Sequence, residues 1–181
     1  MANPGRDERA WVRGAQSGSV ADLEALFRDH WPRAYRAAYL VVHDQTAAED
    51  IAQEAFLAAV RALDRFDRRR PFGPWLHRIV VNRAIDWARA RALRAEVGDQ
   101  RALDAASAPP GVENTRELPA EIVQALASLS PEHRAVIVLR YLMDYTPGEI
   151  GELLDLPRGT VNSRLRRGLD ALAGRIPAEE L

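Results

Sequence analysis

The feature that most constrains the fold is a helical repeat of apolar residues that occurs in two blocks and stops between them. Residues 19–95 and 118–175 place apolar side chains three and four positions apart, the spacing of one face of an α-helix. Residues 96–117 lack this repeat; they are acidic and contain Pro109, Pro110 and Gly111, which is typical of a tether. The sequence therefore predicts an all-α chain of two small helical domains joined by an acidic flexible linker. Residues 1–18 and 176–181 are expected to be N-terminal and C-terminal tails.

Several helix starts are marked by residues that accept a hydrogen bond from the free N–H groups of a first turn. Pro is also tolerated there, because its missing N–H has no helical partner in that position. The predicted starts are Ser19 with Asp22, the capping box of Thr46 with Glu49, Ser130 before Pro131, and Thr146-Pro147 with Glu149. Caps and periodicity agree at each of them, so we expect helices to begin at these points.

Composition excludes several classes of function. The chain has no Cys, which removes disulfides, thiol catalysis and thiolate metal sites. His30, His43, His77 and His133 lack the spacing of metal ligands, and no nucleophile–base set or Gly-rich phosphate loop occurs. We therefore expect no enzyme activity, no metal and no cofactor. No apolar run reaches the roughly 18–20 residues that span a bilayer, and the N-terminus has no export signal, so we expect a cytoplasmic protein without membrane insertion.

Charge is sorted by segment, although the whole chain carries only −1. Residues 64–95 hold nine Arg against three Asp, a net charge of +6, whereas residues 96–132 have a net charge of −5. Such asymmetry is more informative than the total, and it points to the basic segment as a candidate for binding an anionic polymer.

The basic segment combines a cationic loop with a striped helix. The loop contains Phe66, Arg68, Arg69, Arg70 and Phe72; the helix that opens at Pro74 aligns Trp75, Arg78, Asn82, Asp86 and Arg89 on one stripe and Leu76, Val80, Ala84 and Trp87 on the other. Arg follows phosphates, rings stack on bases and an amide pairs with a base edge, so this pattern favours unpaired nucleic acid. The residues alone equally allow an ordinary charged surface for the arginines and core packing for the tryptophans.

The helix from about Ala47 to Arg65 has two different faces at 100° per residue. The predicted core stripe comprises Ala52, Phe56, Ala59, Val60 and Leu63. A second face comprises Asp50, Glu54, Leu57 and Arg61, with Ile51 and Ala58 beside it. Carboxylates around exposed apolar residues suggest docking of a basic, partly apolar partner, whereas a plain solvated face explains the same residues.

The segment from Thr146 to Arg167 has the pattern of two short helices around a tight turn. Gly151 is small where the helices approach, and Asp155 tolerates the left-handed backbone that such a turn requires. Val161, Leu165, Leu169 and Leu172 are expected to face the core, while Asn162, Ser163, Arg166 and Arg167 point outward, with Thr160 and Arg164 at the edges. A cationic, amide-bearing outer face predicts a helix-turn-helix that enters the major groove of DNA.

A ligand-sensing or phosphorylation-controlled regulator with a C-terminal helix-turn-helix is the main alternative. It requires a pocket or receiver domain in the first block, where the sequence is basic and helical and has no βα alternation.

Taken together, the motifs resemble those of the extracytoplasmic-function (ECF, group 4) RNA polymerase sigma factors of the sigma-70 family. Region 2 of that family resembles the run from Ala48 to Phe56 and the run from Phe72 to Asp86; region 4 resembles the run from Leu129 to Val136, Glu149-Ile150, and the run from Gly159 to Leu165. The match covers roughly residues 20–95 and 118–175, in the order of the family.

The resemblance implies promoter recognition, strand opening at the −10 element and transcription initiation, for a stress or envelope-response regulon. It implies three partners: core RNA polymerase, through its β′ clamp helices on region 2 and its β flap on region 4, promoter DNA, and an anti-sigma factor. The implied core-polymerase residues are Asp50, Ile51, Gln53, Glu54, Leu57 and Arg61. The implied −10 residues are Phe66, Arg68, Arg69, Arg70, Trp75, Arg78, Asn82 and Arg89. The implied −35 residues are Arg158, Thr160, Asn162, Ser163, Arg164, Arg166 and Arg167.

Two departures from the family pattern concern specificity. Asn162 stands where the family commonly has a cationic residue, which implies an altered −35 preference. The loop at Arg68, Arg69 and Arg70 is unusually basic, which leaves its base preference open.

Overall fold

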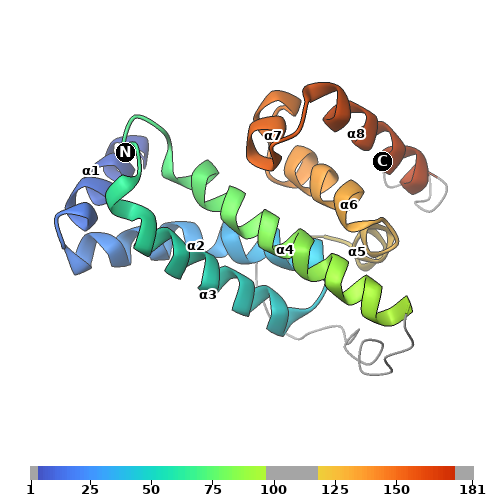
Figure 1. Ribbon diagram of the computed structural model, residues 1–181, viewed down its shortest axis with the longest axis horizontal. Helices are drawn as coiled ribbons and strands as arrows, with labels where there is room; N and C mark the ends of the chain where they lie inside the picture. The colour runs from blue at the N-terminus through green and yellow to red at the C-terminus, as the bar shows by residue number, and fades with distance from the viewer. Residues whose placement is uncertain (1–3, 97–117, 174–181) are drawn as a thin grey trace.

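Helices form all of the regular secondary structure in the part of the chain that the structure describes, residues 4–96 and 118–173 of a computed structural model (Figure 1). In order they are α1 (Pro4–Gln16), α2 (Val20–Val42), α3 (Gln45–Ala62), the 3-10 turn η1 (Leu63–Arg65), α4 (Phe72–Glu96), α5 (Ala120–Ala127), α6 (Pro131–Ile137), the π-helical turn η3 (Val138–Leu142), α7 (Pro147–Leu154) and α8 (Arg158–Ala173). We refer to α1–α4 as the N-terminal unit and to α5–α8 as the C-terminal unit. The predicted all-α fold class is confirmed.

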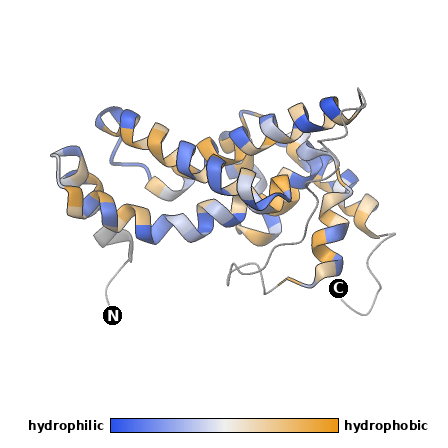
Figure 2. Ribbon diagram, turned by 90° about the horizontal axis from the view of Figure 1, so that it is seen from below, coloured by the Kyte–Doolittle hydropathy of each residue, from blue (hydrophilic) through white to orange (hydrophobic). Residues whose placement is uncertain are grey.

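The N-terminal unit is built on three long helices, α2, α3 and α4, each of which packs against the other two. Each turns an apolar stripe inward: Leu26 and Leu40 of α2, Ala52 of α3, and Leu76 and Val80 of α4 are at most 1% exposed. Hydrophobic and hydrophilic residues alternate along these helices, as expected where only one side is buried (Figure 2). The helical periodicity of the first block therefore reflects a real core.

The prediction of an N-terminal tail over residues 1–18 is wrong for most of that segment, because α1 packs against α2. Val12 of α1 is buried. The Gln16 side chain donates to the carbonyls of Leu63, at 2.8 Å, and Phe66, at 3.1 Å, so α1 also holds the end of η1 in place. The segment is helical because this burial and these hydrogen bonds stabilise a helix that is too short to be stable by itself.

Most of the predicted helix caps are present. The side chains of Ser19, Ser130 and Thr146 each accept a hydrogen bond from the backbone N–H three residues later in the chain. Thr146 and Glu149 together form a full capping box. The exception is Thr46, which does not cap α3: Asp44 accepts from the N–H of Ala47 instead, at 3.0 Å. A carboxylate at the helix start also interacts favourably with the helix dipole, and this explains why α3 begins one residue before Thr46.

The C-terminal unit ends in the predicted helix-turn-helix. Asp155 closes α7 in the left-handed conformation, with φ 54° and ψ 50°, and the chain then turns directly into α8. Gly151 lies under this turn: a Cβ there would come within 2.7 Å of the carbonyl oxygen of Leu156. Both residues therefore have the roles that the sequence predicted for them.

The two units pack against each other. In Figure 1, α6 and α7 lie alongside α4, and α2 also contacts α5, α6 and η3. One link is buried, because the Arg134 guanidinium of α6 donates to the carbonyl of Val41 in α2 at 2.5 Å. Within the predicted linker, Glu96 ends α4, and residues 97–117 lie outside the described residues, as does the predicted tail at residues 176–181.

We predict that Gly151→Ala lowers the free energy of unfolding by about 1–3 kcal/mol, because the backbone of the turn must move to relieve the contact with Leu156. The matched control is Gly159→Ala in α8, where an added Cβ meets nothing within 4 Å. That variant is expected to be neutral or more stable by up to about 1 kcal/mol. Urea unfolding followed by circular dichroism measures both, and equal stabilities for the two variants would contradict the prediction.

Candidate nucleic-acid and protein interfaces

The first candidate interface is the polar stripe of α4. Arg78 and Arg89 are exposed, and Trp75 and Asn82 are half-buried, on the side opposite the buried residues Leu76, Val80 and Ala84. Trp87, predicted to be core, is half-buried, with the Arg91 guanidinium 5.2 Å from its ring centroid. The helix therefore presents cationic, amide and aromatic groups along one line, which is the chemistry that holds unpaired bases.

The loop before α4 is exposed at its cationic residues but not at its first ring. Arg68, Arg69 and Arg70 are exposed, and Arg69 forms an ion pair with Asp67 at 3.1 Å. The structure corrects the prediction that Phe66 holds a flipped base. The Phe66 side chain is only 8% exposed, and its ring centroid lies 4.6 Å from that of Trp75 and 5.8 Å from that of Phe72. Phe66 therefore packs under the loop as part of the core. Among the rings of Phe66, Phe72 and Trp75, only that of Trp75 is partly accessible.

The start of α4 is fixed from the first helix. One carboxylate oxygen of Glu8 accepts from the N–H of Phe72 at 2.9 Å, and the other lies 3.1 Å from Nε2 of the buried His30. The hydrogen bond with His30 holds the pKa of Glu8 below its ordinary value, although burial opposes this. An ionised Glu8 thus accepts from an otherwise free N–H of the first turn and sets where the stripe begins.

The stripe is in contact with the C-terminal unit. Nδ2 of Asn82 lies 3.5 Å from the carbonyl oxygen of Leu153 in α7, and Nε of Arg89 lies 2.5 Å from a carboxylate oxygen of Glu132 in α6. Burial raises the pKa of Glu132, but hydrogen bonds led by that from Arg89 outweigh it and leave the pKa lowered. We call this contact between the two units the seam. It contains a cavity of about 310 Å³, with Trp75 and Arg78 of α4 on one side and α7 on the other.

The second candidate interface is the outer face of α8. Of the residues predicted to read DNA, Arg158, Asn162, Arg166 and Arg167 are exposed; Thr160, Ser163 and Arg164 are half-buried. Val161, Leu165 and Leu172 are buried as predicted. The prediction that Leu169 faces the core is wrong, because its side chain is 41% exposed. The buried arc of α8 also includes Gly168, so it is centred on the side of Leu165 away from Leu169, and Leu169 lies at its edge. Figure 1 shows α8 on the side of α6 that faces away from α4.

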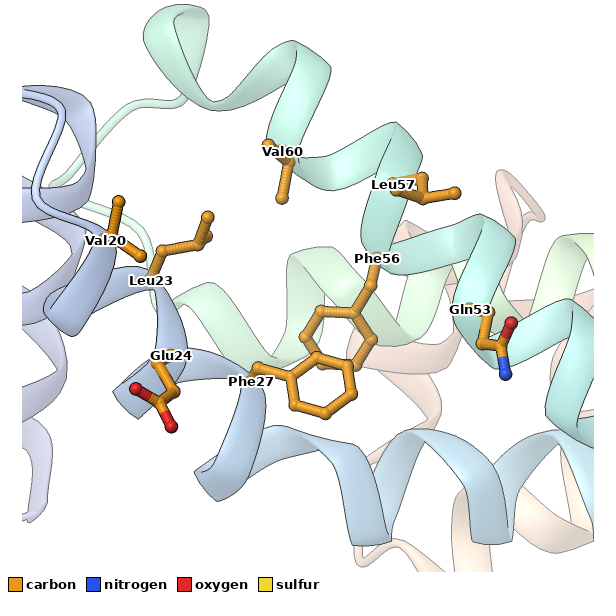
Figure 3. Close-up of a pocket in the computed structure, with 8 residues that line it drawn as sticks. All are labelled: Val20, Leu23, Glu24, Phe27, Gln53, Phe56, Leu57 and Val60. Atoms are coloured by element: carbon orange, nitrogen blue, oxygen red, sulfur yellow. The ribbon is translucent and has the colours of Figure 1, made fainter.

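The third candidate interface is an apolar groove of about 400 Å³ between α2 and α3. Figure 3 shows the residues that line it: Val20, Leu23, Glu24 and Phe27 of α2, and Gln53, Phe56, Leu57 and Val60 of α3. The rings of Phe27 and Phe56 meet in the groove with centroids 4.9 Å apart. Leu57 is 55% exposed, and Val20 and Val60 are exposed as well, so a continuous apolar surface is open to a partner.

The residues predicted to dock a partner fall on two sides of α3. Gln53 and Leu57 line the groove, whereas Asp50 and Glu54 face α4, where Glu54 pairs with Arg83 at 2.7 Å. Arg61 is exposed near the end of the helix. The structure corrects the prediction that Ile51 contacts the partner, because its side chain is only 6% exposed and belongs to the core.

Sequence reasoning missed most of the groove. It assigned Phe56 and Val60 to the core stripe and gave no role to Val20 or Phe27. The available signal was the pair of apolar rows on residues 20–27 and 53–60, but only the packing of α2 on α3 shows that the rows face a common gap.

Across residues 8–95 and 118–173, no group of three or more His, Cys, Asp or Glu side chains is arranged to hold a metal ion. None of the described helices is long and apolar enough to cross a membrane.

A helix-turn-helix unit attached to a helical unit with a cationic, aromatic stripe defines a DNA-binding protein with two contact faces. Comparison with known families gives its membership: sigma-70 region 2 matches residues 26–94, and sigma-70 region 4 matches residues 125–173. The chain is 36% identical to the ECF RNA polymerase sigma factor SigW of Bacillus subtilis, over 91% of this chain and 92% of the relative. It is 35% identical to SigL of Mycobacterium tuberculosis, over 95% and 97%.

The chain therefore belongs to the ECF sigma factors of the sigma-70 family, and the resemblance inferred from its motifs is confirmed. It is an RNA polymerase sigma factor, a transcription initiation factor that acts in promoter recognition.

Two solved structures share its fold. CnrH, in complex with the cytosolic domain of CnrY, superposes with a TM-score of 0.68 at 28% identity, over 93% of this chain and 96% of that chain. RpoE of Bartonella quintana, in complex with the anti-sigma factor NepR, gives a TM-score of 0.69 over 86% and 96%. Its identity of 22% supports likeness of fold alone.

Proposed function

We propose that this sigma factor recognises a promoter at two points while it is bound to core RNA polymerase. The outer face of α8 binds the −35 element as duplex, and the stripe of α4 with the loop at residues 67–71 captures the non-template strand of the −10 element. The observation that carries the proposal is the chemical difference between the two faces. The α8 face is convex, helical and rich in Arg, as major-groove readers are, and the α4 face combines Arg with an amide and a partly accessible Trp, as single-strand binders do.

In this proposal the polymerase performs all of the chemistry, and the sigma factor contributes binding energy alone. Strand opening is favoured when unpaired bases gain contacts on α4 that they lack in the duplex. The protein acts in the cytoplasm, where it meets polymerase and chromosomal DNA, and it needs no cofactor.

We further propose that the groove between α2 and α3 receives the β′ clamp helices of core polymerase. An apolar groove between two helices, with Gln53 and Glu24 on its margins, fits an amphipathic helical partner that presents apolar anchors and donors. Asp50 and Glu54 lie on the other side of α3, beside Arg83 of α4, and offer a second, acidic contact. The β flap then meets the C-terminal unit, and an anti-sigma factor, like the one bound to RpoE, regulates the chain.

Leu57→Glu is expected to weaken binding to core polymerase about tenfold or more, because it puts a charge into an apolar contact. The matched control is Leu93→Glu, on the exposed end of α4 and outside the groove, where the wild-type side chain is 63% exposed. Binding of labelled protein to purified core polymerase measures both. Equal affinities would remove the groove from the docking surface.

Arg166→Ala is expected to weaken −35 recognition by about 1–3 kcal/mol, roughly tenfold to a hundredfold in promoter affinity of the holoenzyme, since one guanidinium contact to the groove is lost. Arg28→Ala is the control, because Arg28 is an exposed Arg of α2 far from α8. Run-off transcription on a genomic library identifies promoters, and footprinting on one of them measures affinity. Unchanged −35 protection in Arg166→Ala would contradict the assignment of α8.

Asn82→Ala is expected to leave promoter docking unchanged and to reduce open-complex formation about tenfold, because the amide contacts a base only after the strands separate. Gln124→Ala, which removes an exposed amide from α5, is the control. Permanganate reactivity of unpaired thymines reports opening, and a filter-binding assay reports docking. Normal opening by Asn82→Ala on several promoters would show that α4 captures the strand by other residues.

A further inference from the structure

The cationic loop between η1 and α4 is held at both of its ends by α1. At the first end, Nε2 of Gln16 donates to the carbonyl of Leu63 at 2.8 Å and to that of Phe66 at 3.1 Å. At the second end, the N–H of Phe72 donates to a carboxylate oxygen of Glu8 at 2.9 Å. Glu8 and Gln16 belong to the same helix and lie about 12 Å apart along its axis. Because a helix is rigid over two turns, α1 fixes how far apart the two ends of the loop lie.

The contact of Glu8 is anchored in turn by a buried side chain of α2. His30 is 6% exposed, and its Nε2 lies 3.1 Å from the second carboxylate oxygen of Glu8. The His30 ring packs against the start of α4: its centroid lies 5.1 Å from that of Phe72, and a Cβ at Gly73 would come within 3.3 Å of its Cε1. Three helices therefore meet at this point, which holds the carboxylate of Glu8 in place beside the first turn of α4.

Between its ends, the loop is a compact turn with hydrogen bonds of its own. The N–H of Arg69 donates to a carboxylate oxygen of Asp67 at 3.0 Å, and the N–H of Arg70 donates to the carbonyl of Asp67 at 2.9 Å. The side chains of Arg68, Arg69 and Arg70 are exposed on this turn. A turn that is closed by its own hydrogen bonds moves as one body, so the position of its arginines depends on how its two ends are held.

The two ends of the loop also carry the rings that support Trp75. Phe66 and Phe72 are buried, and their ring centroids lie 4.6 Å and 5.5 Å from that of Trp75. Trp75 is the partly accessible ring of this cluster, and it is therefore the ring that is available to stack on an unpaired base. A shift of Phe66 or Phe72 would move this ring together with the arginines of the loop.

We propose that Glu8 and Gln16 are positioning residues for strand capture, and that together they form a brace that holds the cationic loop and Trp75 in the geometry that receives the −10 bases. This inference rests on the proposed role of the loop and α4 in capturing the −10 strand. The brace does not contact DNA and acts through the backbone of the loop. A preformed loop binds more tightly, because less conformational freedom is lost when the bases arrive. Both residues precede the segment that matches sigma-70 region 2, residues 26–94.

The test removes the brace and leaves the loop, α4 and the apolar side chains of α1 in place. The variant Glu8→Ala with Gln16→Ala deletes the acceptor at one end of the loop and the donor at the other. The matched control, Glu121→Ala with Gln124→Ala, makes the same two substitutions at exposed positions of α5. A rescue variant, Glu8→Gln, keeps an oxygen that accepts from the N–H of Phe72 and is compared with Glu8→Ala. Circular dichroism and thermal unfolding verify that each full-length variant is folded under the assay conditions.

The measurement is a double-mutant cycle between the protein and the promoter. Each chain is assembled with core polymerase, and the promoter carries single abasic sites along the non-template strand of its −10 element. Filter binding reports docking, and permanganate reactivity of unpaired thymines reports opening. On the intact promoter, we expect the double-Ala variant to dock normally and to have an equilibrium constant for opening about tenfold lower than that of the wild type. The reason is that a loop in the competent geometry about a tenth of the time captures bases about tenfold more weakly.

The abasic templates distinguish positioning from a general loss of stability. On the template whose missing base costs the wild type most, we expect the double-Ala variant and the wild type to open equally, within about twofold, because the brace has no base left to position. A general loss of stability would lower opening by the same factor on both templates. The control pair and Glu8→Gln should open the intact promoter within about twofold of the wild type, and Glu8→Ala should show part of the defect of the double-Ala variant.

Three results would overturn the brace. The double-Ala variant opens the intact promoter as well as the wild type does; or its defect is undiminished on the abasic template; or Glu8→Gln is as defective as Glu8→Ala. The wild type separates these results from a failure of the proposed function. A wild type whose opening depends on none of the −10 bases contradicts strand capture itself, whereas a wild type that depends on one of them, together with any of the three results, retains strand capture and loses the brace.

Discussion

The arrangement of the two units depends on one buried cation. The Arg134 guanidinium of α6 donates to the carbonyls of Leu126, Ala127 and Leu129, at 2.7–2.9 Å, and across the units to that of Val41. These carbonyls lie at or just beyond the C-terminal ends of α5 and α2, where the helix dipole is negative, and that of Leu126 also accepts from the N–H of Leu129 at 3.1 Å. Burial lowers the pKa of Arg134 to about 10, so the group remains charged at neutral pH. A single charge thus joins α5 to α6 and attaches both to α2.

This attachment determines which surfaces face outward. With α6 fixed against the end of α2, the C-terminal unit lies on α4, and α8 is left on the far side, where its arginines are exposed. The apolar groove lies along the first turns of α2 and the last turns of α3, and these contribute nothing to the seam. Arg134 therefore ties the capping of two helix ends to an arrangement in which the stripe of α4 lies against the C-terminal unit and the outer face of α8 is exposed.

Sequence reasoning succeeded for most local determinants, with the cap at Thr46 as the exception, and failed where the determinant was a contact between distant segments. The caps at Ser130 and Thr146 and the turn at Asp155 depend on a few neighbouring residues, and all were predicted. The burial of Phe66 depends on Trp75 and Phe72, and α1 is ordered by contacts with residues far along the chain, although Trp11 and Val12 are its only large apolar residues. The stripe of α4 was predicted as a face, but no periodicity indicates that the C-terminal unit contacts it.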